Sequence, residues 1–254
     1  MKSPNLPENC CEYALQRGHA PLIIFENGLG ATMRKAWDAL LPSLDPQQAR
    51  LTYNRPGYGT RPLATTPRDG AHIVAELRDL LQHLELSAPY VLVGHSMGGL
   101  YMQLFARLHP AEVAALVLID PTHPLQFEGI GTIEQRPWWF RQMFHLFLQV
   151  HGGREELAAA TKTGQQVLAA PPCPAGLPVF ILQSEAAAQA ESKTKNTSEL
   201  DRYSHGLKND FLNLYPGCQL EWVSSGHNIQ EEQPEVVLKT LQAALNAAHT
   251  FRGN

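Results

Sequence analysis

The chain has 254 residues, 44% of them hydrophobic and 17% charged, which is ordinary for a globular protein with a full hydrophobic core. A formal net charge of −4, without any run of Lys or Arg, argues against nucleic acid and against an anionic membrane as partner. No apolar stretch approaches the roughly 18 residues of a membrane span, and residues 1–11 lack the apolar run of a secretory signal.

The cysteines have no paired C-x-x-C spacing, so neither a zinc site nor a redox motif is expected. They are Cys10, Cys11, Cys173 and Cys218. Their spacing gives no indication of an oxidising compartment, and we therefore expect a cytoplasmic protein.

Short apolar segments alternate with amphipathic ones along most of the chain. The apolar segments have the length and composition of buried strands and cover residues 22–25, 49–53, 90–93, 114–119, 179–183 and 220–223. Helical periodicity is found at 36–44, 68–84, 100–108, 201–214 and 234–245, with Asp69 as an N-cap and Pro234 in a first turn. This alternation predicts an α/β fold, with a mostly parallel central sheet flanked by helices.

The segment around Ser96 carries the strongest functional signal. The predicted strand at 90–93 runs directly into a Gly-x-Ser-x-Gly sequence at residues 94–98, and a helical pattern follows until Pro110. Strand, tight turn and helix in this order form a nucleophile elbow, whose strained backbone lifts a serine hydroxyl off the sheet edge. The two glycines are expected where a Cβ would clash. A glycine-rich turn whose serine merely caps the helix is the plain structural alternative.

With this elbow the chain resembles the α/β-hydrolase superfamily, and the resemblance covers nearly everything after residue 20. Residues 26–30 (Glu-Asn-Gly-Leu-Gly) resemble the turn that lends a backbone N–H to the oxyanion hole of these enzymes, which implies Leu29 and Met97 as the two backbone donors. Residues 54–59 (Asn-Arg-Pro-Gly-Tyr-Gly) resemble the superfamily's Asp-x-x-Gly-x-Gly loop, with Asn in place of Asp. The short N-terminal stretch leaves little room for the usual first hairpin, so a shortened sheet edge is expected.

Regular alternation lapses between residues 123 and 177, where the superfamily carries its cap. We therefore predict a hydrolase core at 1–122 and 178–254 and a helical cap or lid insertion at 123–177. An aromatic helix in this insertion could roof an apolar pocket, or its side chains could only pack the cap onto the core. The obvious candidates there to bind a charged substrate are Arg136 and Arg141, which flank the aromatic cluster, besides Arg154.

Acyl transfer requires a nucleophile, a base, a carboxylate that orients the base, and donors for the oxyanion. Ser96 is the predicted nucleophile and His227 the predicted base, in the order along the chain that the superfamily uses. The acid departs from the usual pattern, because alanines occupy the expected positions after the strand at 179–183. Asp120, at the end of the preceding strand, is the favoured candidate, and Glu185 is the alternative. A turn-forming role for an Asp before a proline is the structural alternative for Asp120.

Two further histidines lie near these positions. His95 is next to Ser96, but neighbours in a tight elbow point apart, so His95 is interpreted as packing support. His123 follows the strand that carries Asp120 and is expected to be structural, with lining of the pocket as the alternative.

The predicted function is a serine hydrolase that cleaves a small or medium apolar carboxylic ester, or a related acyl compound, through an acyl-enzyme. This chemistry needs no metal and no organic cofactor, and the expected partner is a small-molecule acyl substrate, with no nucleic acid and no membrane. A serine at the elbow argues against the dehalogenase and epoxide-hydrolase branches, which use Asp there. The alternatives are a lyase, C–C hydrolase or acyltransferase on the same fold, which needs a basic group in the cap, and a catalytically silent ligand receptor.

Overall fold

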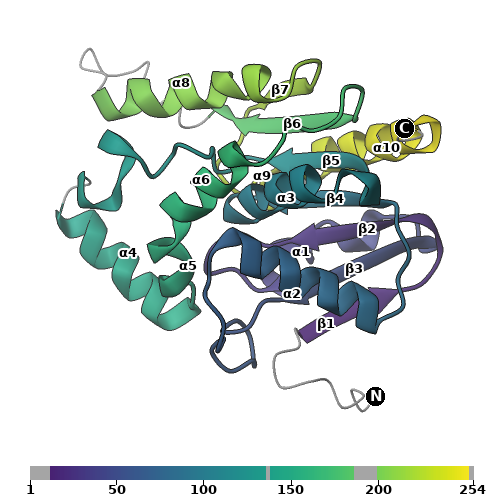
Figure 1. Ribbon diagram of the computed structural model, residues 1–254, viewed down its shortest axis with the longest axis horizontal. Helices are drawn as coiled ribbons and strands as arrows, with labels where there is room; N and C mark the ends of the chain where they lie inside the picture. Colours follow the sequence, from purple (N-terminus) through teal and green to yellow (C-terminus); the bar gives the residue numbers. More distant parts are fainter. Residues whose placement is uncertain (1–11, 136–137, 186–198, 252–254) are drawn as a thin grey trace.

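The computed structural model describes residues 12–135, 138–185 and 199–251, and a seven-stranded sheet forms its centre (Figure 1). The strands are β1 (Glu12–Gln16), β2 (His19–Glu26), β3 (Gln48–Asn54), β4 (Tyr90–His95), β5 (Val113–Ile119), β6 (Val179–Ser184) and β7 (Gln219–Val223). They lie in the order β1-β3-β2-β4-β5-β6-β7. The pairing of β1 with β3 is antiparallel and every other pairing is parallel. The predicted α/β fold is confirmed.

Two hydrophobic layers cover the two faces of this sheet. One contains side chains of α2 (Gly70–His83), α3 (Met97–Leu108) and α8 (Glu199–Leu214). The other contains side chains of α1 (Met33–Trp37), α9 (Ile229–Glu232) and α10 (Pro234–Thr250). Because β4 and β5 lie between these layers, every residue of both strands is buried, which explains their nearly unbroken apolar sequences.

Most predicted elements are found within one or two residues of the expected bounds. The Asp69 side chain accepts a hydrogen bond from the His72 N–H and caps α2, and Pro234 opens α10. The structure adds β1, which the sequence analysis did not predict, so a single strand stands at this edge of the sheet. Its half-buried, mixed polar and apolar residues give no strong periodic signal.

The predicted helix at 36–44 is wrong in its bounds. The structure has the short helix α1, which Thr32 caps by accepting a hydrogen bond from the Lys35 N–H, followed by a 3₁₀ turn at Leu41–Ser43. Pro42 explains the interruption, since proline has no N–H to continue an α-helix. The short helix α9, which follows His227, was also not predicted, and it ends before Pro234.

The insertion at 123–177 contains α4 (Trp138–His151), α5 (Arg154–Ala158) and α6 (Ala160–Ala169). Helix α6 packs on α2 and α3, and its Thr163 hydroxyl accepts a hydrogen bond from the Gly70 N–H. Helix α4 lies at the margin of the molecule (Figure 1). The division into core and cap remains a prediction. The polar, Ala-rich composition of residues 184–198 predicts a loop or a surface helix. Of this run, residues 186–198 lie outside the described residues, as do Cys10, Cys11 and Arg136.

Candidate active site

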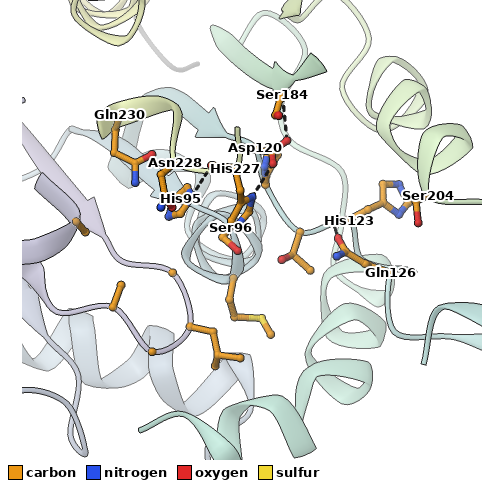
Figure 2. A pocket seen from close by; sticks show the side chains of 18 of the residues that line it. His95, Ser96, Asp120, His123, Gln126, Ser184, Ser204, His227, Asn228 and Gln230 are labelled. Carbon is orange, nitrogen blue, oxygen red and sulfur yellow. Dashed lines mark hydrogen bonds and ion pairs between the residues drawn. The ribbon is translucent and has the colours of Figure 1, made fainter. Parts of the chain in front are cut away.

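A cavity of about 1050 Å³ opens beside the nucleophile elbow (Figure 2). Its wall includes every residue that the sequence analysis assigned to the site, namely Leu29, Ser96, Met97, Asp120 and His227. These residues come from the loop after β2, the turn between β4 and α3, the end of β5, and the loop after β7. The carboxyl ends of parallel strands meet at one edge, which is where open α/β sheets bind ligands.

The elbow has the predicted strained geometry. Ser96 has φ 54° and ψ −122°, in the region of positive φ that non-glycine residues rarely adopt. A Cβ added to Gly94 would lie 2.6 Å from the Gly99 Cα, and one added to Gly98 would collide with the carbonyl of Glu26 at the end of β2. A Cβ on Gly94 would also lie 2.7 Å from the Gly98 carbonyl oxygen, so the two glycines allow the end of β4, the start of α3 and the end of β2 to approach closely.

Asp120 and His227 form the central polar contact of the cavity. The distance between His227 Nδ1 and Asp120 Oδ2 is 2.6 Å (Figure 2). Burial alone would raise the pKa of Asp120, but hydrogen bonds and charge from His227 and Lys208 outweigh it and lower the pKa to about 2. An ionised carboxylate only accepts hydrogen bonds, so Nδ1 of His227 carries a proton, and in the neutral form of the ring the lone pair is on Nε2. The His227 side chain is 55% exposed, and this lone pair is available to a bound molecule.

Two residues that the sequence analysis did not assign hold the second oxygen of Asp120. The Ser184 N–H donates to Oδ1 at 3.1 Å, and Lys208 Nζ on α8 donates to the same atom at 2.8 Å. Asp120 itself has a positive φ of 37°. A strained backbone conformation persists only where surrounding contacts hold the residue firmly, and here Ser184, Lys208 and His227 hold the Asp120 carboxylate. No local sequence pattern marks Lys208, which is 88 residues away along the chain.

His95 does more than support packing. Its Nε2 lies 3.0 Å from the His227 carbonyl oxygen and must donate the hydrogen, because a carbonyl only accepts. Burial, with the nearby charge of His227, lowers the pKa of His95 to about 3, so the ring is neutral. It therefore holds the backbone of the catalytic-base candidate without adding charge.

His123 combines both of its expected roles. It lines the cavity, yet its ring is fixed by the Leu125 N–H at 3.1 Å and by Asp210 at 3.1 Å. Because Nδ1 accepts from Leu125, Nε2 must donate to Asp210.

The two predicted oxyanion donors also face this region. Met97 is the first residue of α3, where N–H groups lack partners within the helix. Leu29 belongs to the loop after β2, and its N–H donates none of the turn and loop hydrogen bonds found in the described residues. Both amides are therefore candidates to stabilise negative charge.

The insertion contributes apolar side chains to one wall of the cavity. Phe144 and Phe147 of α4 line it, with ring centroids 6.3 Å apart, and so do Leu207 and Phe211 of α8. Phe147 is also partly exposed to solvent, and other apolar side chains of α4 are more exposed: Trp138, Trp139, Met143 and Leu146. The helix thus both lines the pocket and faces outward, which the sequence alone did not separate.

Of the basic residues proposed for the alternative chemistries, Arg136 lies outside the described residues, and neither Arg141 nor Arg154 is among the described residues that line the cavity. Arg141 instead donates to the Glu134 carbonyl at 3.4 Å. Among the described residues, the lysines of the wall are Lys35 and Lys208, and Lys208 donates to Asp120. In residues 12–135, 138–185 and 199–251, no cluster of three or more His, Cys, Asp or Glu side chains could hold a metal ion. Within these same ranges, no helix is both long and apolar enough to cross a bilayer.

The family of the chain follows from its sequence as well as its fold. The profile of the family described as alpha/beta hydrolase fold matches residues 21–233, and the chain belongs to this family. Among curated proteins, the uncharacterized protein YqjL of Bacillus subtilis is 32% identical over 99 residues, which are 39% of this chain and 39% of YqjL. The matched part is thus well under half of that relative's length.

Solved structures show the same fold. An esterase from Thermogutta terrifontis is 20% identical, with a TM-score of 0.60 and coverage of 94% of both chains. The type II thioesterase BorB from the borrelidin biosynthetic cluster is 16% identical, with a TM-score of 0.61 and coverage of 92% of this chain and 96% of that one. At these identities, the two neighbours show that the fold is shared.

Proposed function

We propose that the protein is a serine hydrolase that cleaves a small or medium apolar carboxylic ester, or a related acyl compound such as a thioester, through an acyl-enzyme. The observation that carries this proposal is the hydrogen bond between Asp120 and His227 inside the cavity that Ser96 also lines. This bond orients the neutral His227 ring with its lone pair on Nε2, and the ring lines the cavity, which supports a role as general base. The esterase and thioesterase of the same fold support ester and thioester substrates as the class.

The reaction proceeds in two half-reactions. His227 Nε2 takes the Ser96 hydroxyl proton as Oγ attacks the substrate carbonyl, and the carbonyl electrons move to its oxygen. The Leu29 and Met97 N–H groups stabilise that oxyanion. When the intermediate collapses, His227 gives its proton to the leaving alcohol or thiol. Water then attacks the acyl-enzyme by the same route, which releases the acid and restores Ser96.

The cavity is consistent with an apolar substrate of this size. Ligand pockets for small molecules occupy about 300–1,000 Å³ and are mostly apolar, with a few convergent polar groups. At about 1050 Å³, the cavity is at the upper end of this range. The phenylalanines of α4 and the apolar residues of α8 provide the apolar walls.

An active-site probe tests the assignment directly. A fluorophosphonate should label the wild-type protein and fail to label Ser96→Ala, whose folding is checked by its melting temperature. Labelling that persists in Ser96→Ala would refute the nucleophile. Turnover of p-nitrophenyl esters of increasing acyl length then defines the substrate range. Absence of both labelling and turnover in a folded wild-type protein would favour a ligand receptor instead.

A further inference from the structure

Arg55 lies behind the loop that carries Leu29, in the motif at 54–59 to which the proposed reaction gives no role. Its side chain is 1% exposed, and all five guanidinium N–H groups have acceptors. Nε and Nη2 donate to the two carboxylate oxygens of Glu156, each at 2.9 Å. Nη1 donates to Glu26 and, at 2.9 Å, to the Asn27 carbonyl, and Nη2 donates to the Gly28 carbonyl at 3.3 Å.

The bond to the Gly28 carbonyl bears on the direction of the Leu29 N–H. In a planar trans peptide, the C=O of one residue and the N–H of the next point in opposite directions. Because Arg55 holds the Gly28 carbonyl on its own side, the Leu29 N–H must point away from Arg55. Leu29 lines the cavity, and Arg55 contacts the preceding carbonyl on the other side of the peptide. The guanidinium therefore fixes the orientation of the Leu29 N–H, the proposed oxyanion donor.

The insertion fixes Arg55 in turn. Glu156 belongs to α5, 101 residues from Arg55, and it is 2% exposed. The Tyr58 hydroxyl donates to Glu156 at 2.7 Å and also accepts from the Gly30 N–H at 3.5 Å. The Tyr101 hydroxyl donates to the same Glu156 oxygen at 3.3 Å, and Arg68 donates to the other at 3.3 Å. Glu156 is therefore the junction between the insertion and the loop after β2.

The charges of Arg55 and Glu156 are maintained despite their burial. Burial alone would raise the pKa of Glu156, but the adjoining Arg55 outweighs it and lowers that pKa. Burial would likewise lower the pKa of Arg55, but Glu156 and Glu26 hold it well above its ordinary value. Buried ion pairs often stabilise a fold no better than apolar residues of equal volume. A gain in stability alone is thus a weak reason for this cluster, whereas fixing the geometry of a reactive loop is a specific one.

We propose that Arg55, held by Glu156 and Tyr58, is a positioning residue that sets the Leu29 amide for the oxyanion, so that docking of α5 completes the oxyanion hole. This inference rests on the proposed function. It assigns the 54–59 motif and the insertion a role in transition-state binding. Lysine cannot replace Arg55, because an ammonium group cannot make the bidentate and carbonyl contacts together.

The sharpest test compares two tyrosines that donate to the same Glu156 oxygen. Tyr58→Phe removes a hydroxyl that also contacts the loop, whereas Tyr101→Phe removes one that contacts Glu156 from α3. We expect Tyr58→Phe to lower kcat on a p-nitrophenyl ester about tenfold with little change in KM, because a displaced oxyanion donor acts in the transition state. Tyr101→Phe should stay within about twofold of wild type. Equal losses in both variants would overturn the proposal.

Arg55→Lys and Glu156→Gln test the contacts that link Glu156, Arg55 and the Gly28 carbonyl. Each should lower kcat by about a hundredfold with KM nearly unchanged, close to the loss of one oxyanion donor. Melting temperatures identify variants that fail to fold, and the tyrosine pair remains decisive in that case. Wild-type kcat in a folded Arg55→Lys would overturn the proposal.

A readout that does not depend on hydrolysis separates this inference from the proposed function. With isotopic labelling of leucine, the amide resonance of Leu29 should shift in Tyr58→Phe and Arg55→Lys and stay in place in Tyr101→Phe. An unmoved resonance in all three variants contradicts the positioning role, even in an active enzyme. Missing fluorophosphonate labelling of wild type, with the expected resonance shifts, contradicts the proposed function instead.

Discussion

Two clusters of charged side chains flank Ser96, and they differ in their access to solvent. On the β5 side, Asp120 is bonded to Lys208 and to a His227 ring that is 55% exposed. On the β2 side, Arg55 and Glu156 are almost completely buried. Both clusters contain a carboxylate with a cationic partner, but only the first reaches into the cavity through a titratable ring.

This difference follows from what each cluster would have to do. A general base must meet its substrate and exchange protons with water, so its ring has to remain accessible. A cluster that orients a loop has no such need, and the absence of water strengthens its electrostatic contacts. The helices of the insertion differ in the same way. Helix α5 is anchored by the buried Glu156, whereas α4 has apolar side chains that line the cavity or face solvent.

The largest effect is expected from a substitution of Asp120, the carboxylate of the more exposed cluster. Asp120→Asn should lower turnover of an activated ester by about 10⁴, because the neutral amide no longer selects the required His227 tautomer. The matched variant Glu185→Gln, on the loop where the superfamily usually has its acid, should change turnover little. Kinetics with a p-nitrophenyl ester measure both, and the reverse result would transfer the role of the acid to Glu185.

A smaller effect is expected at the cation of the same cluster. Lys208→Met removes positive charge from beside Asp120, so protonated His227 becomes easier to form. The acidic limb of the pH profile of kcat/KM should therefore move to higher pH, on the order of half a unit. Lys208→Arg, which keeps the charge, is the control. A profile that stays in place in Lys208→Met would show that this lysine is structural alone.

The smallest effect concerns stability and has opposite signs in the two clusters. The folded pKa of Asp120, about 2, is below its ordinary value of 3.8, so its stabilising contribution is lost as pH falls through this range. Burial raises the pKa of Glu26 from 4.5 to about 7, against the opposing charge of Arg55, so its contribution is complete below 4.5 and is lost as pH rises to about 7.

Urea unfolding across this pH range measures the two contributions. Glu26→Gln should flatten the fall in unfolding free energy between pH 4.5 and about 7. Asp120→Asn should flatten its rise between about 2 and 3.8. An unchanged slope in Glu26→Gln would show that this carboxylate does not titrate abnormally in the folded protein.

Local patterns in the sequence were enough for strands β2 to β7, the elbow and the order of Ser96, Asp120 and His227 along the chain. Such patterns are readable because a buried strand, a tight turn and a helix cap each depend on neighbouring residues. The helix at 36–44 was misplaced although its signals, Thr32 and Pro42, were also local. Strand β1 was not predicted, because an edge strand of partly buried residues shows little hydrophobic periodicity in its sequence.

The sequence by itself determined the fold class and the reactive groups of the candidate site. Tertiary structure decided which groups touch: Lys208 on Asp120 from 88 residues away, His95 on the His227 carbonyl, and Arg55 on Glu156 across 101 residues. Long-range pairs have no repeating spacing, since their geometry arises when separate elements pack together. A single sequence therefore does not reveal these contacts, and in this structure they hold Asp120, His227 and the loop of Leu29 in place.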